Sequence, residues 1–355
     1  MRRRSGWRSS KPLNSTGTSS STSAASTRPS RWPSSSGRTA AGSPSGPQTW
    51  PRSRRCGQCR RGARASRNVD FVQHILNGLL QGCILALIGL GFSLVWGILN
   101  IINLAHAAFI MLAAYATYFL WSLAGIDPFI SLPLTMAVLF GLGYILQRYV
   151  INLVMGATIL TTFLLTFGFE SLLVNLALRL FSADTRQTKP IYANASFSIG
   201  PLYVPYTQLG AVVVALLLTY LLYLFLDHTR TGSSIRAVGQ DRVAARLMGI
   251  DIGRTYALTF GIGAALAAAS GTLLSTTSGF APNGFSAFNV LAFSVVVLGG
   301  LGSIPGALLG GLVFGLVYEF GGTYVLSQRD VVIFAILILV LVLRPTGLLG
   351  REGYR

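Results

Sequence analysis

The chain has 355 residues, of which 52% are hydrophobic, and a formal net charge of +18 at pH 7. Residues 1–67 contribute 15 of the 28 basic residues and no Asp or Glu, whereas the remainder holds 13 basic and 10 acidic residues. The strong positive charge therefore belongs to the N-terminal segment alone, and the composition does not predict a nucleic-acid partner.

The N-terminal extension, residues 1–68, consists mostly of Ser, Thr, Arg, Gly, Pro and Ala. It cannot bury enough apolar surface to offset its conformational entropy, so we predict that it is disordered. Its lone CxxC pair, Cys56 and Cys59, has no second pair and no nearby His, so no metal site is predicted. Because the composition changes abruptly at Asp70, we predict that translation starts at Val69 and that the extension is not native. Sequencing the N-terminus of the purified protein tests this hypothesis.

Long apolar segments fill residues 69–355, and a helix needs about 20 residues to cross the hydrocarbon core of a membrane. Candidate spans lie near 71–98, 103–121, 128–148, 157–181, 206–227, 255–278, 289–301, 303–321 and 330–344. The segment at 289–301 is too short to cross without tilting or thinning the bilayer, which favours a half-helix paired with the next segment. The sequence thus predicts an all-α, polytopic transmembrane helix bundle of about eight or nine segments, with broken or half helices.

Polar residues interrupt the apolar pattern where the first span gives way to the second, at Asn100, Asn103 and His106. A break in a membrane helix is tolerated where the freed backbone is buried in protein or faces a watery cavity. Glu170, in the fourth span, is the one carboxylate at clear membrane depth. These four residues are candidate pathway residues, with a satisfied interior histidine as the alternative for His106. So few buried carboxylates argue against an ion-coupled carrier.

The loop at 228–254 carries five Arg against two Asp. Short loops rich in Lys and Arg stay on the cytoplasmic side of a membrane, so this loop is predicted to be cytoplasmic. Alternation along the spans then places the N-terminal end of the first span outside and the C-terminus inside. The same orientation would carry the 15 positive charges of the extension across the membrane, which is a second reason to predict a start at Val69.

The second half of this loop has an amphipathic pattern. If Asp241 to Met248 is helical, its apolar side chains share one stripe: Val243, Ala244, Leu247 and Met248. Arg242 and Arg246 lie apart from that stripe, and Gly249 can end the helix in the left-handed conformation. Such a helix favours a groove on a partner or the bilayer surface, the alternative being a solvated connector.

Glycines recur near the C-terminus. Gly302, Gly306 and Gly310 repeat every fourth residue, which is typical of helices that pack closely in lipid. The Gly-rich stretch 298–306 lacks the Lys and Ser/Thr of a phosphate loop, so it does not predict a nucleotide site. Discontinuous helices of this kind more often line transport pathways.

Four stretches together resemble the LivH-type permeases of bacterial branched-chain amino-acid ABC importers. They are NGLLQGCILALIGLGFSLVWGILNIINLAHAAFIMLAAY (77–115), TRTGSSIRAVGQDRVAARLMGID (229–251), VVVLGGLGSIPGALLGG (295–311) and LRPTGLLG (343–350). The resemblance covers nearly all of residues 69–355, which it identifies as a transmembrane permease domain. Family members carry Gly where Ala107 stands in this chain.

The resemblance implies a permease subunit, not an enzyme, that forms the pathway for branched-chain or related amino acids in a bacterial inner membrane. It also implies that the loop docks in a cleft of an ATP-hydrolysing subunit, with these residues at the contact: Arg236, Gln240, Asp241, Arg242, Val243, Ala244, Arg246, Leu247, Met248 and Gly249. Arg236, Arg242 and Arg246 would pair with acidic groups at the rim of the cleft. The chain itself would bind no cofactor, because partners hydrolyse the ATP.

The implied partners are a second, LivM-like permease, two LivG/LivF-like ATP-binding subunits, an extracytoplasmic amino-acid-binding protein and membrane lipid. Other amino acids, short amides and urea remain open as cargo, since similar permeases carry them. An ion-coupled secondary carrier or channel for a small polar solute is the alternative function.

Overall fold

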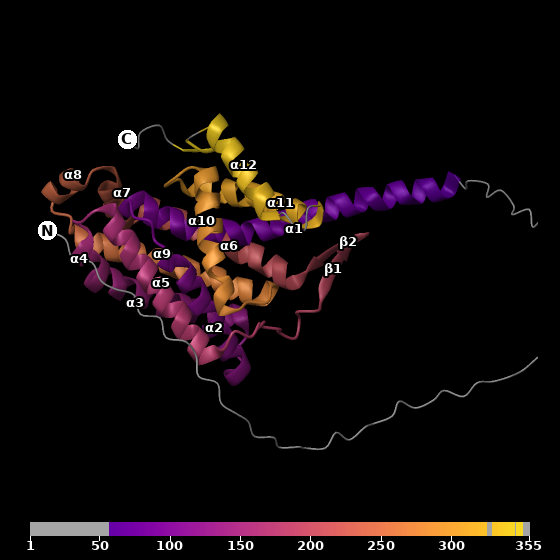
Figure 1. The fold of residues 1–355 in the computed structure, drawn as a ribbon, viewed down its shortest axis with the longest axis horizontal. Coiled ribbons are helices and arrows are strands. Elements are labelled where there is room, and N and C mark those ends of the chain that lie inside the picture. The colour runs from indigo at the N-terminus through magenta and orange to yellow at the C-terminus, as the bar shows by residue number, and fades with distance from the viewer. Residues whose placement is uncertain (1–56, 325–328, 345, 351–355) are drawn as a thin grey trace, which may run out of the picture. The chain divides into compact units, whose positions relative to one another are not determined.

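The computed structural model describes residues 57–324, 329–344 and 346–350, and Figure 1 shows their fold. In chain order the helices are α1 (Gly57–Leu99), α2 (Ala105–Ala124), α3 (Pro128–Leu146), α4 (Asn152–Val154), α5 (Ile159–Phe181), α6 (Tyr206–His228), α7 (Arg230–Gln240), α8 (Arg242–Leu247), α9 (Ile252–Thr277), α10 (Ser286–Gly299), α11 (Ile304–Tyr324) and α12 (Arg329–Leu343). A π-helical turn, Gln147–Ile151, follows α3, and a 3-10 turn, Pro282–Gly284, precedes α10. The strands β1 (Ser196–Ile199) and β2 (Leu202–Pro205) form an antiparallel hairpin.

Eight helical segments within the described residues are long and apolar enough to cross a membrane, by length and composition. They are Val69–Leu99, Ala105–Ala124, Pro128–Val154, Ile159–Phe181, Tyr206–His228, Ile252–Thr277, Pro282–Gly299 and Ile304–Thr323. A shorter apolar helix, Phe334–Leu343, follows within α12. The predicted all-α bundle of about eight or nine membrane segments is confirmed.

The start of α1 differs from the sequence-based expectation. Residues 57–68 are helical, although the sequence predicts disorder throughout 1–68. Arg and Ala have high helix propensity, and these residues simply continue the apolar helix that follows them. The remainder of the predicted extension, including Cys56, lies outside the described residues.

Two helices, α1 and α9, form the centre of the bundle. In each of them 89% of the most apolar 18-residue stretch is buried, whereas the corresponding fraction is 17% for α5 and 28% for α6. The outer helices therefore present apolar side chains such as Leu172, Leu216 and Tyr220 on their exposed faces. Such faces suit lipid or a membrane-embedded partner, because water would solvate them poorly.

Small residues let α11 approach α1 until their backbones touch. A Cβ atom placed on Gly315 of α11 would lie 2.3 Å from the Cα atom of Gly82 in α1. One placed on Gly311 would lie 2.3 Å from the Cα atom of Ala86. These contacts leave no room for a larger side chain, so packing at close range holds α11 on α1.

The bundle has two ends, which we call the hairpin end and the α8 end. At the hairpin end Gln73 of α1 bonds the backbone of Tyr203 in β2, and Arg186 pairs with Phe280 in an isolated β-bridge. At the α8 end Asn152 donates to the carbonyl of Gly253 at 3.1 Å. The C-terminal segment reaches the same α8 end, where the amide of Leu348 donates to the carbonyl of Leu298 at 2.9 Å. Loops that are predicted to lie on the same side of the membrane, because successive spans alternate in direction, therefore lie at the same end of the bundle.

Two helices begin between the two ends of the bundle. After α1 ends, Asn100 takes a positive φ of 54°, which turns the chain back toward the interior. His106, at the start of α2, lies 3.0 Å from the carbonyl of Ile88. Ile88 precedes Leu99 by eleven residues, which is about 16 Å along a helix. The first turn of α10 lies at the same depth in the bundle as the start of α2, since Asn289 of α10 bonds Leu104.

Candidate functional site

The loop at 228–254, which the sequence predicts to dock an ATPase, forms two short helices with defined ends. Asp241 breaks the chain between α7 and α8 with non-helical angles, and its side chain accepts from the amides of Val243 at 2.7 Å and Ala244 at 3.1 Å. The end of α8 is a Schellman motif, in which Gly249 takes a φ of 81° and donates to the carbonyl of Arg246 at 3.0 Å. Ile250 donates to Ala245 at 3.1 Å and completes the motif. The sequence therefore holds α8 as a discrete helix beyond the bundle core.

The exposed face of α8 is apolar. Val243 is 70% exposed, and Leu247 and Met248 are each 83% exposed, while Ala245 on the opposite face is buried. Ala244 is exposed as well. We call Val243, Ala244, Leu247 and Met248 the α8 stripe. An apolar stripe at the end of the bundle, held by a capped helix, is suited to a groove on a partner.

The three arginines expected at the rim of that groove lie in different surroundings. Arg242 donates to the carbonyl of Leu99 at 2.9 Å and to the side-chain oxygen of Asn100 at 3.1 Å. Arg236 forms an ion pair with Asp227. Arg246 is exposed. Arg242 and Arg236 are thus engaged within this chain, and Arg242 connects α8 to the end of α1.

A cavity of about 580 Å³ opens at the α8 end. Ser93 and Gly97 of α1, Gly239 and Gln240 of α7, and Gly302 in the turn between α10 and α11 are among its lining residues. Helix α7 is therefore a wall of the cavity and not only a support for α8, so a movement of α7 would change the width of the cavity.

A buried polar cluster lies where α2 begins, and we call it the polar junction. Thr166 of α5 donates to the carbonyl of Ile102 at 3.1 Å. Asn289 of α10 donates to the carbonyl of Leu104 at 2.7 Å and accepts from the amide of Ala107 at 3.0 Å. These side chains satisfy backbone groups that the interrupted helix leaves free, which explains how the break is tolerated inside the bundle.

Of the predicted pathway residues, three lie in or beside this junction and are almost fully buried. His106 is 1% exposed, contacts Ile88 through its ring nitrogen and meets the ring of Phe92 edge-on at 5.8 Å. Asn103 is 3% exposed and Glu170 is 5% exposed. Asn100, by contrast, is exposed at the α8 end beside Arg242.

Two acceptor atoms in the junction lack a hydrogen-bond partner among the described residues, Oδ1 of Asn103 and Oε1 of Glu170. The side chains of Ser286 and Asn289 interact with the carboxyl group of Glu170. The sequence analysis did not single out Thr166, Ser286 or Asn289. An Asn in the apolar run that becomes α10 is the signal that was available for Asn289.

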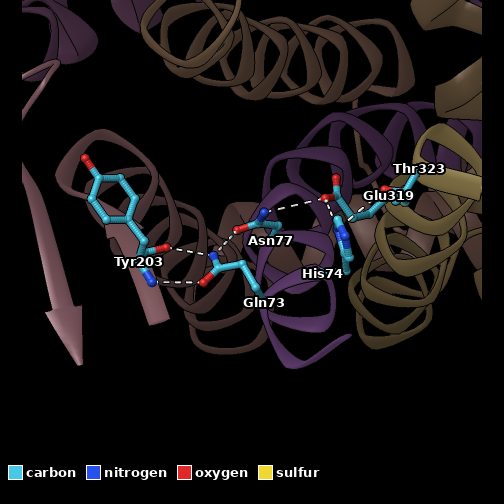
Figure 2. Close-up of polar contacts among 6 residues, drawn as sticks. All are labelled: Gln73, His74, Asn77, Tyr203, Glu319 and Thr323. Carbon is cyan, nitrogen blue, oxygen red and sulfur yellow. Dashed lines mark hydrogen bonds and ion pairs between the residues drawn. The ribbon is translucent and has the colours of Figure 1, made fainter. Parts of the chain in front are cut away.

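A second polar network holds the hairpin end together (Figure 2). Gln73 exchanges hydrogen bonds with the backbone of Tyr203 and donates to Asn77 at 2.8 Å. His74 lies 3.2 Å from Glu319 of α11, so this carboxylate has a basic partner. The network joins β2, α1 and α11.

In a nearby loop, Tyr192 donates to Asp127 at 3.0 Å. Burial, together with this hydrogen bond, raises the pKa of Tyr192 above its usual range.

The three glycines of the predicted packing stripe occupy two kinds of site. A Cβ on Gly306 would lie 2.4 Å from the carbonyl oxygen of Gly299, and one on Gly310 would lie 2.4 Å from that of Val295. Both glycines thus face α10 at backbone contact. Gly302 lies outside the helix, in the turn before α11, with a φ of 76°, and its close neighbour is Gly97 of α1.

A bundle of membrane-length helices, two of which begin at a buried polar junction, together with a capped amphipathic helix at one end, defines a polytopic helical membrane protein of the permease class. Residues 74–341 match the family model described as "Branched-chain amino acid transport system / permease component". The chain belongs to this family of permeases.

Named relatives agree with the family match. The chain is 35% identical over 296 residues to the high-affinity branched-chain amino acid transport system permease protein BraD of Pseudomonas aeruginosa, covering 79% of this chain and 96% of that protein. It is 34% identical over 297 residues to the permease protein LivH of the corresponding system in Escherichia coli, with the same coverage. A probable LivH of Methanocaldococcus jannaschii is 28% identical over 298 residues, covering 78% of this chain and 92% of that protein. No solved structure matches the chain.

Proposed function

We propose that this chain is a permease subunit of an ATP-driven importer whose cargo is a branched-chain or related amino acid. The family match and the relatives named for branched-chain amino acid transport support the transport class and the cargo. The observation that carries the mechanism is the exposed α8 stripe, which is suited to a cleft on an ATPase.

In this proposal the α8 end faces the cytoplasm and the hairpin end faces outward. The five Arg between residues 230 and 254 favour this orientation. Two ATP-binding subunits dock at the α8 end, a second permease completes the pathway, and an extracytoplasmic binding protein delivers cargo at the hairpin end.

Contacts at the α8 end suggest how docking reaches the pathway. Closure of the ATPases moves α7 and α8 together. Arg242 passes this movement to Leu99 and Asn100, where the chain turns toward the polar junction. Helix α7 changes the width of the cavity that it lines. A rigid helix pair thus acts as a lever on the break between α1 and α2.

Uptake into reconstituted vesicles tests the proposal against an ion-coupled carrier. The vesicles contain this chain with its partner permease and ATPases, and the binding protein is added with labelled leucine. We expect accumulation that requires ATP on the ATPase side and continues when proton and sodium gradients are collapsed. Uptake that ignores ATP and stops with the gradient would refute the proposed function.

A further inference from the structure

The polar junction holds two acceptors that are buried without a partner. Glu170 and Asn103 are 5% and 3% exposed, yet Oε1 of Glu170 and Oδ1 of Asn103 make no hydrogen bond to the described residues. A buried acceptor that is left unsatisfied costs free energy, and a carboxylate costs more than an amide. Two such groups in one junction point to a donor that arrives from outside the chain.

Glu170 also lacks a charged partner among the described residues. Glu170 forms no ion pair within the described part of the chain, and its polar neighbours Ser286 and Asn289 are neutral. Asn289 donates to Leu104 and accepts from Ala107, so at most one N–H of its side-chain amide is left for Glu170. Glu319, the carboxylate of α11, is paired with His74 instead. The group that satisfies Glu170 should therefore be a cation with N–H donors.

The junction lies beside an exposed edge of the bundle. Ser286, which interacts with Glu170, is exposed at the start of α10, and so is Ala287. Phe167 and Gly168, on the turn of α5 before Glu170, are exposed too. Glu170 therefore lies close to the exposed edge formed by α5 and α10.

We propose that the polar junction binds the ammonium group of the cargo, with Glu170 as the counter-charge and Asn103 as a second acceptor. This inference rests on the proposed function, because an amino acid supplies the positively charged donor that the junction lacks. An ammonium group offers three N–H donors, which is enough for one hydrogen bond to each orphan atom. The apolar side chain of the cargo then lies toward the apolar surfaces of α5 and α10.

Substitution of the carboxylate is the first test. Glu170→Gln keeps the size and removes the charge, Glu170→Asp keeps the charge, and Glu319→Gln is the matched control in α11. Each variant is reconstituted with its partners and saturated with leucine-loaded binding protein. We expect leucine uptake to fall at least tenfold for Glu170→Gln, to fall less for Glu170→Asp, and to stay within twofold for Glu319→Gln.

A competition experiment separates ligand binding from a structural role. Labelled leucine is bound to the purified wild-type transporter without the binding protein. The competitors are 3-methylbutylamine, which has the amine but no carboxylate, and 4-methylpentanoate, which has the carboxylate but no amine. We expect the amine to displace leucine at concentrations at least tenfold lower than the acid. The advantage of the amine should disappear in Glu170→Gln.

The outcomes distinguish the two proposals. If wild-type vesicles import leucine with ATP but Glu170→Gln imports it equally well, the ammonium site is refuted and the proposed function stands. Equal displacement by the amine and the acid in the wild type refutes the site even where Glu170→Gln fails to fold. If wild-type vesicles import no amino acid with ATP, the proposed function fails and the cargo inference fails with it.

Discussion

Arg242 shows how one side chain can couple two parts of a membrane protein. The sequence places it beside an amphipathic stripe and suggests a contact with a partner. In the structure its guanidinium group donates to the carbonyl of Leu99 and lies over the ring of Tyr256 at 5.6 Å. It therefore connects α8 to the break between α1 and α2.

The lever role of Arg242 predicts uncoupling when it is removed. Arg242→Ala loses a charged hydrogen bond worth about 1.5–3 kcal/mol, so α8 can move without α1. We expect the ATPases to remain bound and to hydrolyse ATP, while leucine uptake per ATP falls at least fivefold. Parallel assays of uptake and phosphate release measure this ratio. Arg254→Ala, at an exposed site on α9, is the control. An unchanged ratio in Arg242→Ala would remove Arg242 from the coupling route.

Leu247 tests the α8 stripe itself. It is 83% exposed in this chain alone, so Leu247→Asp should not affect folding or membrane insertion. In the complex the new charge would be buried in an apolar cleft, which is costly. We expect at least tenfold less ATPase to co-purify with the variant. Leu123→Asp, equally exposed at 83% but on α2 near the hairpin end, should keep its ATPases. Full retention by Leu247→Asp would contradict docking through this stripe.

At the scale of helices, glycine positions decide which elements touch. Gly306 and Gly310 face α10, whereas Gly311 and Gly315 face α1. Helix α11 therefore meets two neighbours through two adjacent glycine rows. The repeat of small residues predicts close packing, but it does not say which neighbour each row meets, because that depends on how the helices are arranged.

Overpacking one of these rows should destabilise the bundle. Gly306→Leu places a side chain where even a Cβ atom would lie 2.4 Å from a backbone oxygen. We expect a loss of roughly 1–3 kcal/mol or more, seen as a lower thermal midpoint in detergent. Gly141→Leu is the matched control, since nothing lies within 4 Å of a Cβ on Gly141. A midpoint equal to that of the wild type would show that α10 and α11 separate easily.

At the scale of the whole molecule, the two ends should lie on opposite sides of the membrane. Ile191, 104% exposed, marks the hairpin end, and Met248, 83% exposed, marks the α8 end. In a background without native cysteines, we expect a membrane-impermeant maleimide to label Ile191→Cys on intact cells. Met248→Cys should be labelled only after the cells are permeabilised. Labelling of Met248→Cys on intact cells would reverse the proposed orientation.

The local sequence pattern was sufficient to predict much of the fold of this protein. Long apolar runs predict the membrane segments, because a membrane helix forms its backbone hydrogen bonds within itself. Its length and hydropathy are therefore enough to recognise it from the local sequence. The limits of α8 follow from Asp241 and Gly249 for a similar reason, since caps act within one turn. Residues 57–68 are helical where the sequence predicts disorder, because composition alone does not show that they continue α1.

The polar junction and the Arg242 contact follow from packing that local pattern does not encode. Asn289 bonds a carbonyl 185 residues away, and Arg242 bonds one 143 residues away. Asn103 and Glu170 are visible in the sequence as polar residues in apolar surroundings, but their missing partners are not. Whether a buried acceptor is satisfied depends on every helix that surrounds it, and only the assembled bundle places those helices.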